Sequence, residues 1–179
     1  SIVKDVNVGN ILLIDDGETA LKVVEKNSDH LVVEVQNDGT IGSRKSVNIP
    51  GVPVNLPSIT EKDKKCIEIA MKYGVDFIAH SFVRNKQDVL DVQKILDTQK
   101  SEIKIIAKIE NQEGVDNIDE IYEHAFGVMV ARGDLGIEVP QEKIPSIQRL
   151  LIRKAIEYKK PVIVATQMLH TMIENPRPT

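Results

Sequence analysis

The amino-acid sequence predicts an α/β protein in which a small all-β segment precedes about four βα units. In residues 1–50, short runs of β-type residues alternate with Asp-Gly turns, whereas after residue 57 helical patterns alternate with continuous apolar runs. We therefore expect two domains, 1–50 and 51–179. The later apolar runs begin near residues 75, 103, 127 and 161, at intervals of 28, 24 and 34 residues that each suit one βα unit.

The first 50 residues are expected to form short antiparallel strands. The runs 11–14 and 20–24 are joined by Asp15-Asp16-Gly17, a hairpin signal because glycine tolerates positive φ. In residues 31–35, Leu31, Val33 and Val35 are expected to face one side of a strand, with Val32 and Glu34 on the other. The segment 49–57 contains three prolines and is predicted to be a linker.

The later helices carry their own start and stop signals. Thr60 and Asn85 are predicted N-caps, Gly74 is a predicted helix end, and Pro145 suits a first helical turn. Strands are predicted over 75–83, 103–109, 127–131 and 162–165. The helical residues expected to face inwards are Ile67, Ala70, Met71, Val89, Val92, Ile95, Leu96, Val115, Ile118, Ile121, Tyr122, Ile147, Leu150, Leu151 and Ile156.

Four βα units with apolar strands suit either a doubly wound sheet or about half of an eight-stranded β/α barrel. A dinucleotide-binding doubly wound sheet expects a glycine-rich turn after its first strand, but that run ends in Ser81-Phe82-Val83-Arg84. Polar residues gather instead at the carboxyl ends of all four runs, where barrel enzymes place their chemistry. The sequence therefore favours a partial TIM barrel.

Composition excludes several classes of function. The 23 Lys and Arg residues against 27 Asp and Glu give a net charge of -4, and the chain has no Trp, so nucleic-acid binding is disfavoured. One cysteine, Cys66, excludes an internal disulfide. No apolar run approaches the roughly 20 residues that span a bilayer, so we expect a cytoplasmic protein without a membrane partner. The ending Asn175–Thr179 lacks a terminal helix or polar tail, so we expect a piece of a longer chain.

Candidate functional residues follow three neighbouring strands. Lys108 and Glu110 lie two residues apart and therefore face the same side of their strand. Gly133 and Asp134 follow the next strand, and Thr166 follows the last. Taken alone, the Lys108 and Glu110 pair is as typical of an ordinary strand end as of a functional site. The other two motifs alone are more typical of a glycine-rich turn and of a cap. Their coincidence at one edge of the sheet favours a site.

The residue types at this edge favour a divalent metal ion and an anionic substrate. Glu110 and Asp134 would repel each other unless a cation lay between them, and two carboxylates suit Mg²⁺ or Mn²⁺. Lys108 adds positive charge that can neutralise a transferring phosphoryl group or an enolate. The amides of Gly133 and Asp134, with Thr166, can bind a substrate carboxylate.

Six stretches of this sequence resemble the pyruvate kinase family. They occur in the same order as in that family and extend over nearly the whole chain. They are SRKSVNIPG from Ser43, VDFIAHSFVR from Val75, KIENQEGVDNID from Lys108, VMVARGDLGIEVP from Val128, KPVIVATQML from Lys160 and the terminal NPRPT.

The resemblance implies transfer of a phosphoryl group from phosphoenolpyruvate to ADP, which yields pyruvate and ATP with Mg²⁺ and usually K⁺. By matching position, Lys108 binds the substrate and stabilises the transition state, and Glu110 and Asp134 are the metal ligands. Gly133, Asp134 and Thr166 form the substrate carboxylate pocket, and Thr166 also lies near the carbon that is protonated. Lys45 contacts the nucleotide from a mobile lid formed by the β segment. The full-length enzyme is expected to be a homotetramer.

Three residues depart from the family, and expected segments are missing. Ser46 stands where the family commonly has glycine, which affects the geometry of Lys45, and His80 stands where it often has a small residue. We interpret His80 and Cys66 as variations in packing. The strands that supply the K⁺ ligands and that close the barrel are not in this chain, so we expect exposed sheet edges and an inactive isolated chain.

Two alternative functions stay open at this point. The chain can be a non-catalytic α/β module that binds Mg²⁺ and an anion, or part of another barrel enzyme that uses phosphoenolpyruvate or pyruvate. The Asp15-Asp16-Gly17 turn and the terminal NPRPT argue against the second alternative, because both lie outside a generic metal site.

Overall fold

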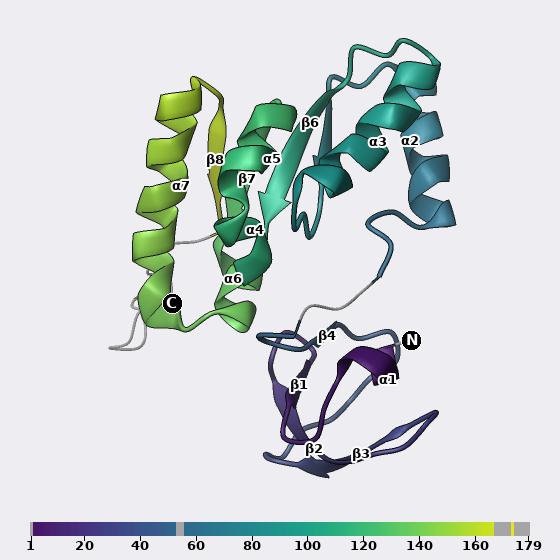
Figure 1. The fold of residues 1–179 in the computed structure, drawn as a ribbon, viewed down its shortest axis with the longest axis vertical. Coiled ribbons are helices and arrows are strands. Elements are labelled where there is room, and N and C mark those ends of the chain that lie inside the picture. The colour runs from purple at the N-terminus through teal and green to yellow at the C-terminus, as the bar shows by residue number, and fades with distance from the viewer. Residues whose placement is uncertain (1, 53–55, 167–172, 174–179) are drawn as a thin grey trace.

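The computed structural model describes residues 2–52, 56–166 and 173, and it contains two four-stranded sheets (Figure 1). Part of the predicted linker, residues 53–55, lies outside the described residues. The end of one stretch that carries the resemblance, Gln167–Leu169, and the whole of another, Asn175–Thr179, lie outside them as well.

The N-terminal sheet is antiparallel, with strand order β3-β2-β1-β4. Its elements are α1 (Ile2–Asp5), β1 (Ile11–Ile14), β2 (Thr19–Lys26), β3 (Leu31–Val35) and β4 (Val47–Asn48). The predicted hairpin between β1 and β2 is confirmed, because Asp15, Asp16 and Gly17 all have positive φ and the two strands pair. The side chains of Val6, Val23 and Ile49 form a small buried hydrophobic core in this N-terminal segment.

The second sheet is parallel, and its strands lie in sequence order. They are β5 (Phe77–His80), β6 (Lys104–Ile109), β7 (Gly127–Ala131) and β8 (Val162–Ala165). A doubly wound sheet reverses its strand order at a switch point, and the described strands show no such reversal. All four carboxyl ends meet at one edge of the sheet, which brings the candidate residues into one region.

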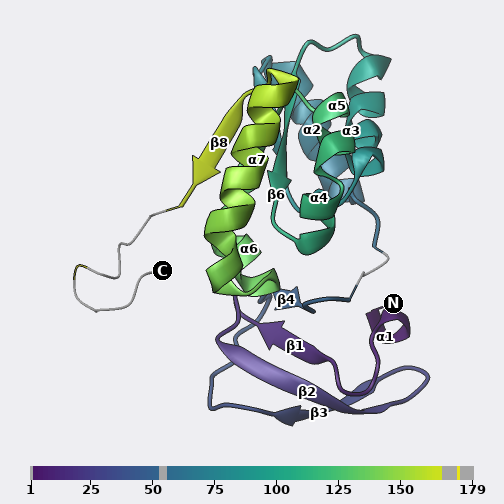
Figure 2. The same cartoon turned by 60° about the vertical axis from the view of Figure 1, so that its left-hand side comes forward.

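Helices connect and cover the parallel strands (Figure 2). They are α2 (Glu61–Tyr73), α3 (Lys86–Thr98), α4 (Gln112–Asp116), α5 (Ile118–His124), α6 (Arg132–Glu138), η1 (Gln141–Lys143) and α7 (Ile144–Tyr158). Consecutive helices α2, α3, α5 and α7 pack against one another in that order. Helices pack in this way when they line one face of a sheet whose strands are in sequence order.

The predicted capping signals are confirmed. Thr60 accepts a hydrogen bond from the Asp63 amide while the Asp63 carboxylate accepts one from the Thr60 amide, which completes a capping box. Asn85 caps α3, and Gly74 ends α2 in the left-handed conformation. The helices bury Ile67, Val89, Val92, Leu96, Val115, Ile118, Ile121, Tyr122, Ile147 and Leu151 in one continuous core with the strands.

Several expectations were wrong in detail. The strand predicted over 75–83 ends at His80, because Phe82 adopts a left-handed conformation that no strand can continue. The helix expected over 115–122 is broken at Asn117 into α4 and α5, and the expected glycine-rich turn after β7 is the short helix α6.

One side chain expected in the interior lies at the surface, because Ile156 is 72% exposed on α7. The thiol of Cys66, interpreted as a variation in packing, is exposed on α2 and does not pack into the core. Within the described residues, no helix has both the length and the apolar character needed to cross a lipid bilayer.

Candidate functional site

The carboxyl end of β6 carries an ion pair between Lys108 and Glu110. Their Nζ and Oε1 atoms lie 2.6 Å apart, so the two side chains meet as their spacing predicts. Lys108 also donates a hydrogen bond of 3.0 Å to the hydroxyl of Ser81, which directly follows β5. Two neighbouring strands therefore hold this ammonium group.

Glu110 is only 4% exposed, although it carries a carboxylate. Its second oxygen, Oε2, accepts a hydrogen bond of 2.7 Å from the amide of Phe82. Burial raises the pKa of the Glu110 carboxyl, whereas the Lys108 ammonium and the Phe82 amide act to lower that pKa. The negative charge of Asp134 acts to raise it further, because like charges repel.

Asp134 belongs to the first turn of α6, which follows β7 directly, and its side chain is exposed towards solvent. A cation placed between Asp134 and Glu110 would remove their repulsion, and their oxygens keep lone pairs beyond those that Lys108 and Phe82 use. Oxygen donors of this kind suit Mg²⁺ or Mn²⁺. Within the ranges that the structure describes, no cluster of three metal-ligating side chains occurs, so the protein supplies two carboxylates at this point. Magnesium sites commonly combine one or two carboxylates with substrate and water oxygens.

Gly133 and Thr166 lie against each other across the ends of β7 and β8. A Cβ atom added to Gly133 would lie 3.4 Å from Cγ2 of Thr166, so a larger residue would crowd this contact. Thr166 itself has a φ of 74°, in the left-handed region that a β-branched residue rarely adopts. Arg132 donates hydrogen bonds to the carbonyl oxygens of Ala165 and Thr166 and so ties α6 to the end of β8.

Lys45 lies in the N-terminal segment, where it pairs with Asp15. Their Nζ and Oδ2 atoms are 2.6 Å apart, and the hydrogen bond and charge of Asp15 raise the pKa of Lys45. Ser46 stands where the family of the resemblance commonly has glycine. Its hydroxyl donates a hydrogen bond to the Asp16 carboxylate and accepts one from the Asp16 amide. These bonds attach the loop that carries Lys45 to the β1–β2 turn. Within the described residues, Lys45 has no hydrogen bond or ion pair with Lys108 or Glu110.

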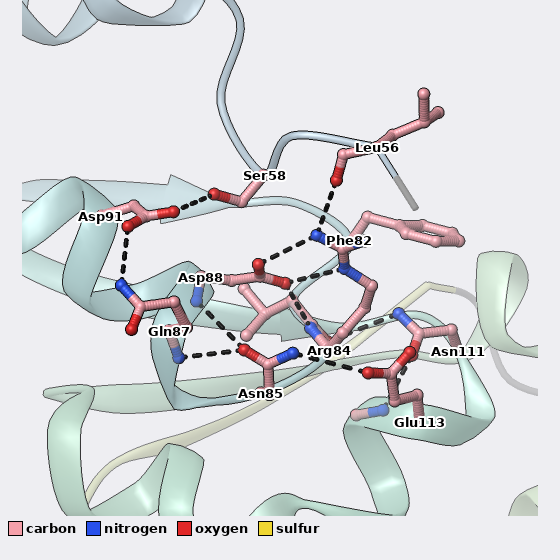
Figure 3. A network of polar contacts seen from close by, with 12 residues as sticks. Leu56, Ser58, Phe82, Arg84, Asn85, Gln87, Asp88, Asp91, Asn111 and Glu113 are labelled. Carbon is pink, nitrogen blue, oxygen red and sulfur yellow. Dashed lines mark hydrogen bonds and ion pairs between the residues drawn. The ribbon is translucent and has the colours of Figure 1, made fainter. Parts of the chain in front are cut away.

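A network of polar contacts fixes the turn between β5 and α3 (Figure 3). Both Nε and Nη2 of Arg84 donate to the buried carboxylate of Asp88, and Nη2 also donates to the Leu56 carbonyl. The Asn111 side chain donates to the Val83 carbonyl from the end of β6. The turn that contains Ser81 and Phe82 is therefore bonded both to the end of β6, through Asn111, and to the linker, through Leu56.

His80 precedes this turn and is 9% exposed. Its Nε2 atom has no hydrogen-bond partner within the described part of the chain. Burial lowers the pKa of His80, and the nearby carboxylates of Asp88, Asp63 and Asp91 oppose that shift. His80 is thus a buried, neutral side chain at the end of β5, near acidic residues of the helices α2 and α3.

Reasoning from the sequence did not single out Ser81, Phe82 or Arg132 as parts of this site. Ser81 and Arg132 each follow a predicted strand at the edge where the other candidates gather, so their positions were a usable signal. Phe82 contributes its backbone amide rather than its side chain, and a residue name gives no signal for that role.

Comparisons with known proteins agree on one family. The family described as "Pyruvate kinase, barrel domain" matches residues 1–179. A pyruvate kinase of Borreliella burgdorferi is 57% identical over 178 residues, which cover 99% of this chain and 37% of that protein. Pyruvate kinases of Geobacillus stearothermophilus and Bacillus licheniformis are 54% and 53% identical, and their matches cover 100% and 99% of this chain and 31% of each relative. The chain thus spans about a third of the length of these curated relatives.

Proposed function

Because this chain belongs to the pyruvate kinase family, we propose that it is part of an enzyme that transfers a phosphoryl group from phosphoenolpyruvate to ADP. The products are pyruvate and ATP. The observation that carries this proposal is the meeting of the Lys108 ammonium and the Glu110 carboxylate at the end of β6, with Asp134 nearby. Phosphoryl transfer needs this combination, since its catalysis consists largely of positioning and charge stabilisation.

Lys108 is the catalytic residue in this proposal. Its ammonium faces the charge that develops on the transferring phosphoryl group and on the enolate oxygen, and it stabilises both. Glu110 and Asp134 hold Mg²⁺, which Mn²⁺ can replace. When bound, this ion neutralises phosphate and enolate charge as a Lewis acid. The burial of Glu110 supports this role, because a buried carboxylate gains most from an added cation.

The carboxylate of phosphoenolpyruvate binds at the start of α6 and the end of β8. The amides of Gly133 and Asp134 point out of the first turn of α6, where a helix leaves its N–H groups without partners inside the helix. Thr166 adjoins Gly133, so its hydroxyl borders the same pocket. The hydroxyl also lies on the side from which the enolate carbon is protonated, and it serves there as a proton relay.

Residues 1–50 form the C-terminal part of a β-barrel-like lid domain, and residues 51–179 form the central part of the catalytic TIM barrel. The lid carries Lys45. Its ammonium group contacts the nucleotide when it leaves the Asp15 carboxylate and binds phosphate oxygens instead. Closure of the lid over the end of the parallel sheet excludes water from the transfer. The sequential order of β5 to β8 supports the assignment of about four βα units of an eight-stranded barrel.

Further partners follow from family membership. The full-length enzyme uses K⁺ through residues outside this chain, is a homotetramer and works in the cytoplasm. The isolated chain is inactive because the remaining strands of the barrel supply part of the site. A net charge of -4 disfavours binding of nucleic acid.

The test is product formation by the full-length protein that contains this segment, incubated with phosphoenolpyruvate, ADP, Mg²⁺ and K⁺. We expect equal amounts of pyruvate and ATP, and no pyruvate when ADP is left out. Binding of Mn²⁺ without any product would instead support a non-catalytic binding module. Consumption of phosphoenolpyruvate without formation of ATP would support another barrel enzyme.

A further inference from the structure

We propose that Ser81 is a positioning residue, whose hydroxyl holds the Lys108 ammonium in place for catalysis. This inference rests on the function proposed above. The Nζ atom of Lys108 donates to Ser81 Oγ over 3.0 Å and lies 2.6 Å from Glu110 Oε1. An ammonium group has three N–H donors, so these two contacts leave one donor for a ligand. Ser81 and Glu110 together set the direction of that third donor.

Ser81 is itself held by the backbone that follows it. The Phe82 amide donates to Glu110 Oε2 over 2.7 Å, and the Val83 amide donates to the Lys108 carbonyl over 3.3 Å. Residues 81–83 therefore bond to residues 108–110 through three successive groups, one side chain and two amides. This row of bonds depends on the left-handed conformation of Phe82, with a φ of 59°.

The strained turn points to a local constraint. A phenylalanine with positive φ costs conformational energy, and such residues persist where the surrounding structure fixes them. Here the turn directs the Phe82 amide to Glu110 and leaves the Ser81 hydroxyl beside Lys108. Without the hydroxyl, Glu110 is the one side-chain partner that Lys108 keeps among the described residues, and the ammonium can rotate about that contact.

Loss of this second contact is expected to affect the chemical step more than substrate binding. A small misplacement of a catalytic group costs up to about 10²-fold in rate, because the reacting geometry is reached less often. Binding of phosphoenolpyruvate in this proposal depends mainly on the metal ligands and on the carboxylate pocket around Gly133. The expected signature is therefore a lower kcat at a nearly unchanged KM.

The experiment compares Ser81→Ala with Ser81→Thr in the full-length protein. Threonine keeps the hydroxyl, and its extra methyl group has room because Ser81 is exposed. Ser146→Ala is the matched control, since that hydroxyl donates to the Lys143 carbonyl at the start of α7. For Ser81→Ala we expect kcat to fall about tenfold or more with KM for phosphoenolpyruvate within about twofold. Ser81→Thr should restore most of kcat, and Ser146→Ala should match the wild type.

A second measurement does not depend on activity. The rate at which trinitrobenzenesulfonate modifies Lys108 is followed by peptide mass spectrometry, and an ammonium held by two partners should react slowly. We expect faster modification in Ser81→Ala and wild-type rates in Ser81→Thr and Ser146→Ala.

The outcomes separate this inference from the proposed function. A wild-type protein that forms no pyruvate overturns the function, while the modification rates still decide whether Ser81 holds Lys108. An unchanged modification rate in Ser81→Ala overturns the positioning role. An active protein in which Ser81→Ala leaves kcat unchanged, or in which Ser81→Thr loses as much kcat as Ser81→Ala, also overturns it.

Discussion

The side-chain amide of Asn48 donates a hydrogen bond of 2.9 Å to the carboxylate of Glu138. Asn48 ends β4 of the antiparallel sheet, and Glu138 ends α6, whose first turn carries Gly133 and Asp134. Both views of the fold place β4 below α6 (Figures 1 and 2). One short helix therefore touches the N-terminal segment at one end and the proposed substrate pocket at the other.

We predict that Asn48→Asp loosens this connection. The change would place two carboxylates at hydrogen-bonding distance in a partly buried position, where like charges repel. Hydrogen exchange of the full-length protein should become faster in β4 and α6 and stay the same in α3. Asn27→Asp is the control, because the Asn27 side chain bonds to its near neighbours Glu25 and His30 in the β2–β3 region. Unchanged exchange in α6 would show that the contact does not couple the two segments.

Removal of the Glu110 charge should weaken metal binding. Glu110→Gln keeps the shape of the side chain but loses a charged oxygen ligand, so we expect affinity for Mn²⁺ to fall about tenfold or more. Calorimetric titration of the full-length protein with Mn²⁺ measures this. Glu102→Gln provides the comparison, because Glu102 lies at the opposite end of β6. Equal affinities in the two variants would remove Glu110 from the metal site.

Local features of the fold could be predicted from the sequence. Thr60, Asn85 and Gly74 mark helix ends because caps depend on bonds between near neighbours in the chain. The pairing of Lys108 with Glu110 follows from the alternation of side chains along a strand.

Features that depend on distant residues could not be predicted. The left-handed turn at Phe82 is held by Glu110, which lies 28 residues later, and nothing in the residue types around Phe82 indicates it. The periodicity of α7 placed Ile156 inside, yet its side chain is exposed in the folded chain. The helix α6 was missed because its glycines favour a turn by local propensity.

Acid should destabilise the protein through His80. Burial holds the pKa of His80 below its ordinary value in the folded state, whereas the unfolded chain binds the proton at about pH 6.5. The unfolded state therefore takes up more protons as pH falls below about 6.5, and the free energy of unfolding decreases until the folded pKa is passed.

Denaturant titrations at mildly alkaline and mildly acidic pH test this prediction. We expect part of the acid-induced loss of stability to disappear in His80→Ala, even though that variant is less stable overall because it leaves a cavity. The carboxylates of Asp63, Asp88 and Asp91 and the Arg84 guanidinium surround His80 and are the same in both proteins. Identical pH dependence in the two proteins would contradict the prediction.

Loss of the capping box should destabilise α2. Thr60→Ala removes the hydroxyl that accepts from the Asp63 amide, and we expect a loss of about 1 kcal/mol in the free energy of unfolding. Thr40→Ala, in an exposed loop, should change it by less than about 0.5 kcal/mol. Equal effects of the two substitutions in denaturant titrations would show that the cap contributes little.

The most direct test of the proposed function is the rate of pyruvate formation by Lys108→Met in the full-length protein, with Lys104→Met as its control. Both lysines belong to β6, but Lys104 is exposed at the amino end of the strand, away from Glu110. We predict that Lys108→Met lowers kcat by at least about 10²-fold, as the loss of a group that stabilises transition-state charge does. Lys104→Met should keep the wild-type rate. An active enzyme in which Lys108→Met retains that rate would contradict the account.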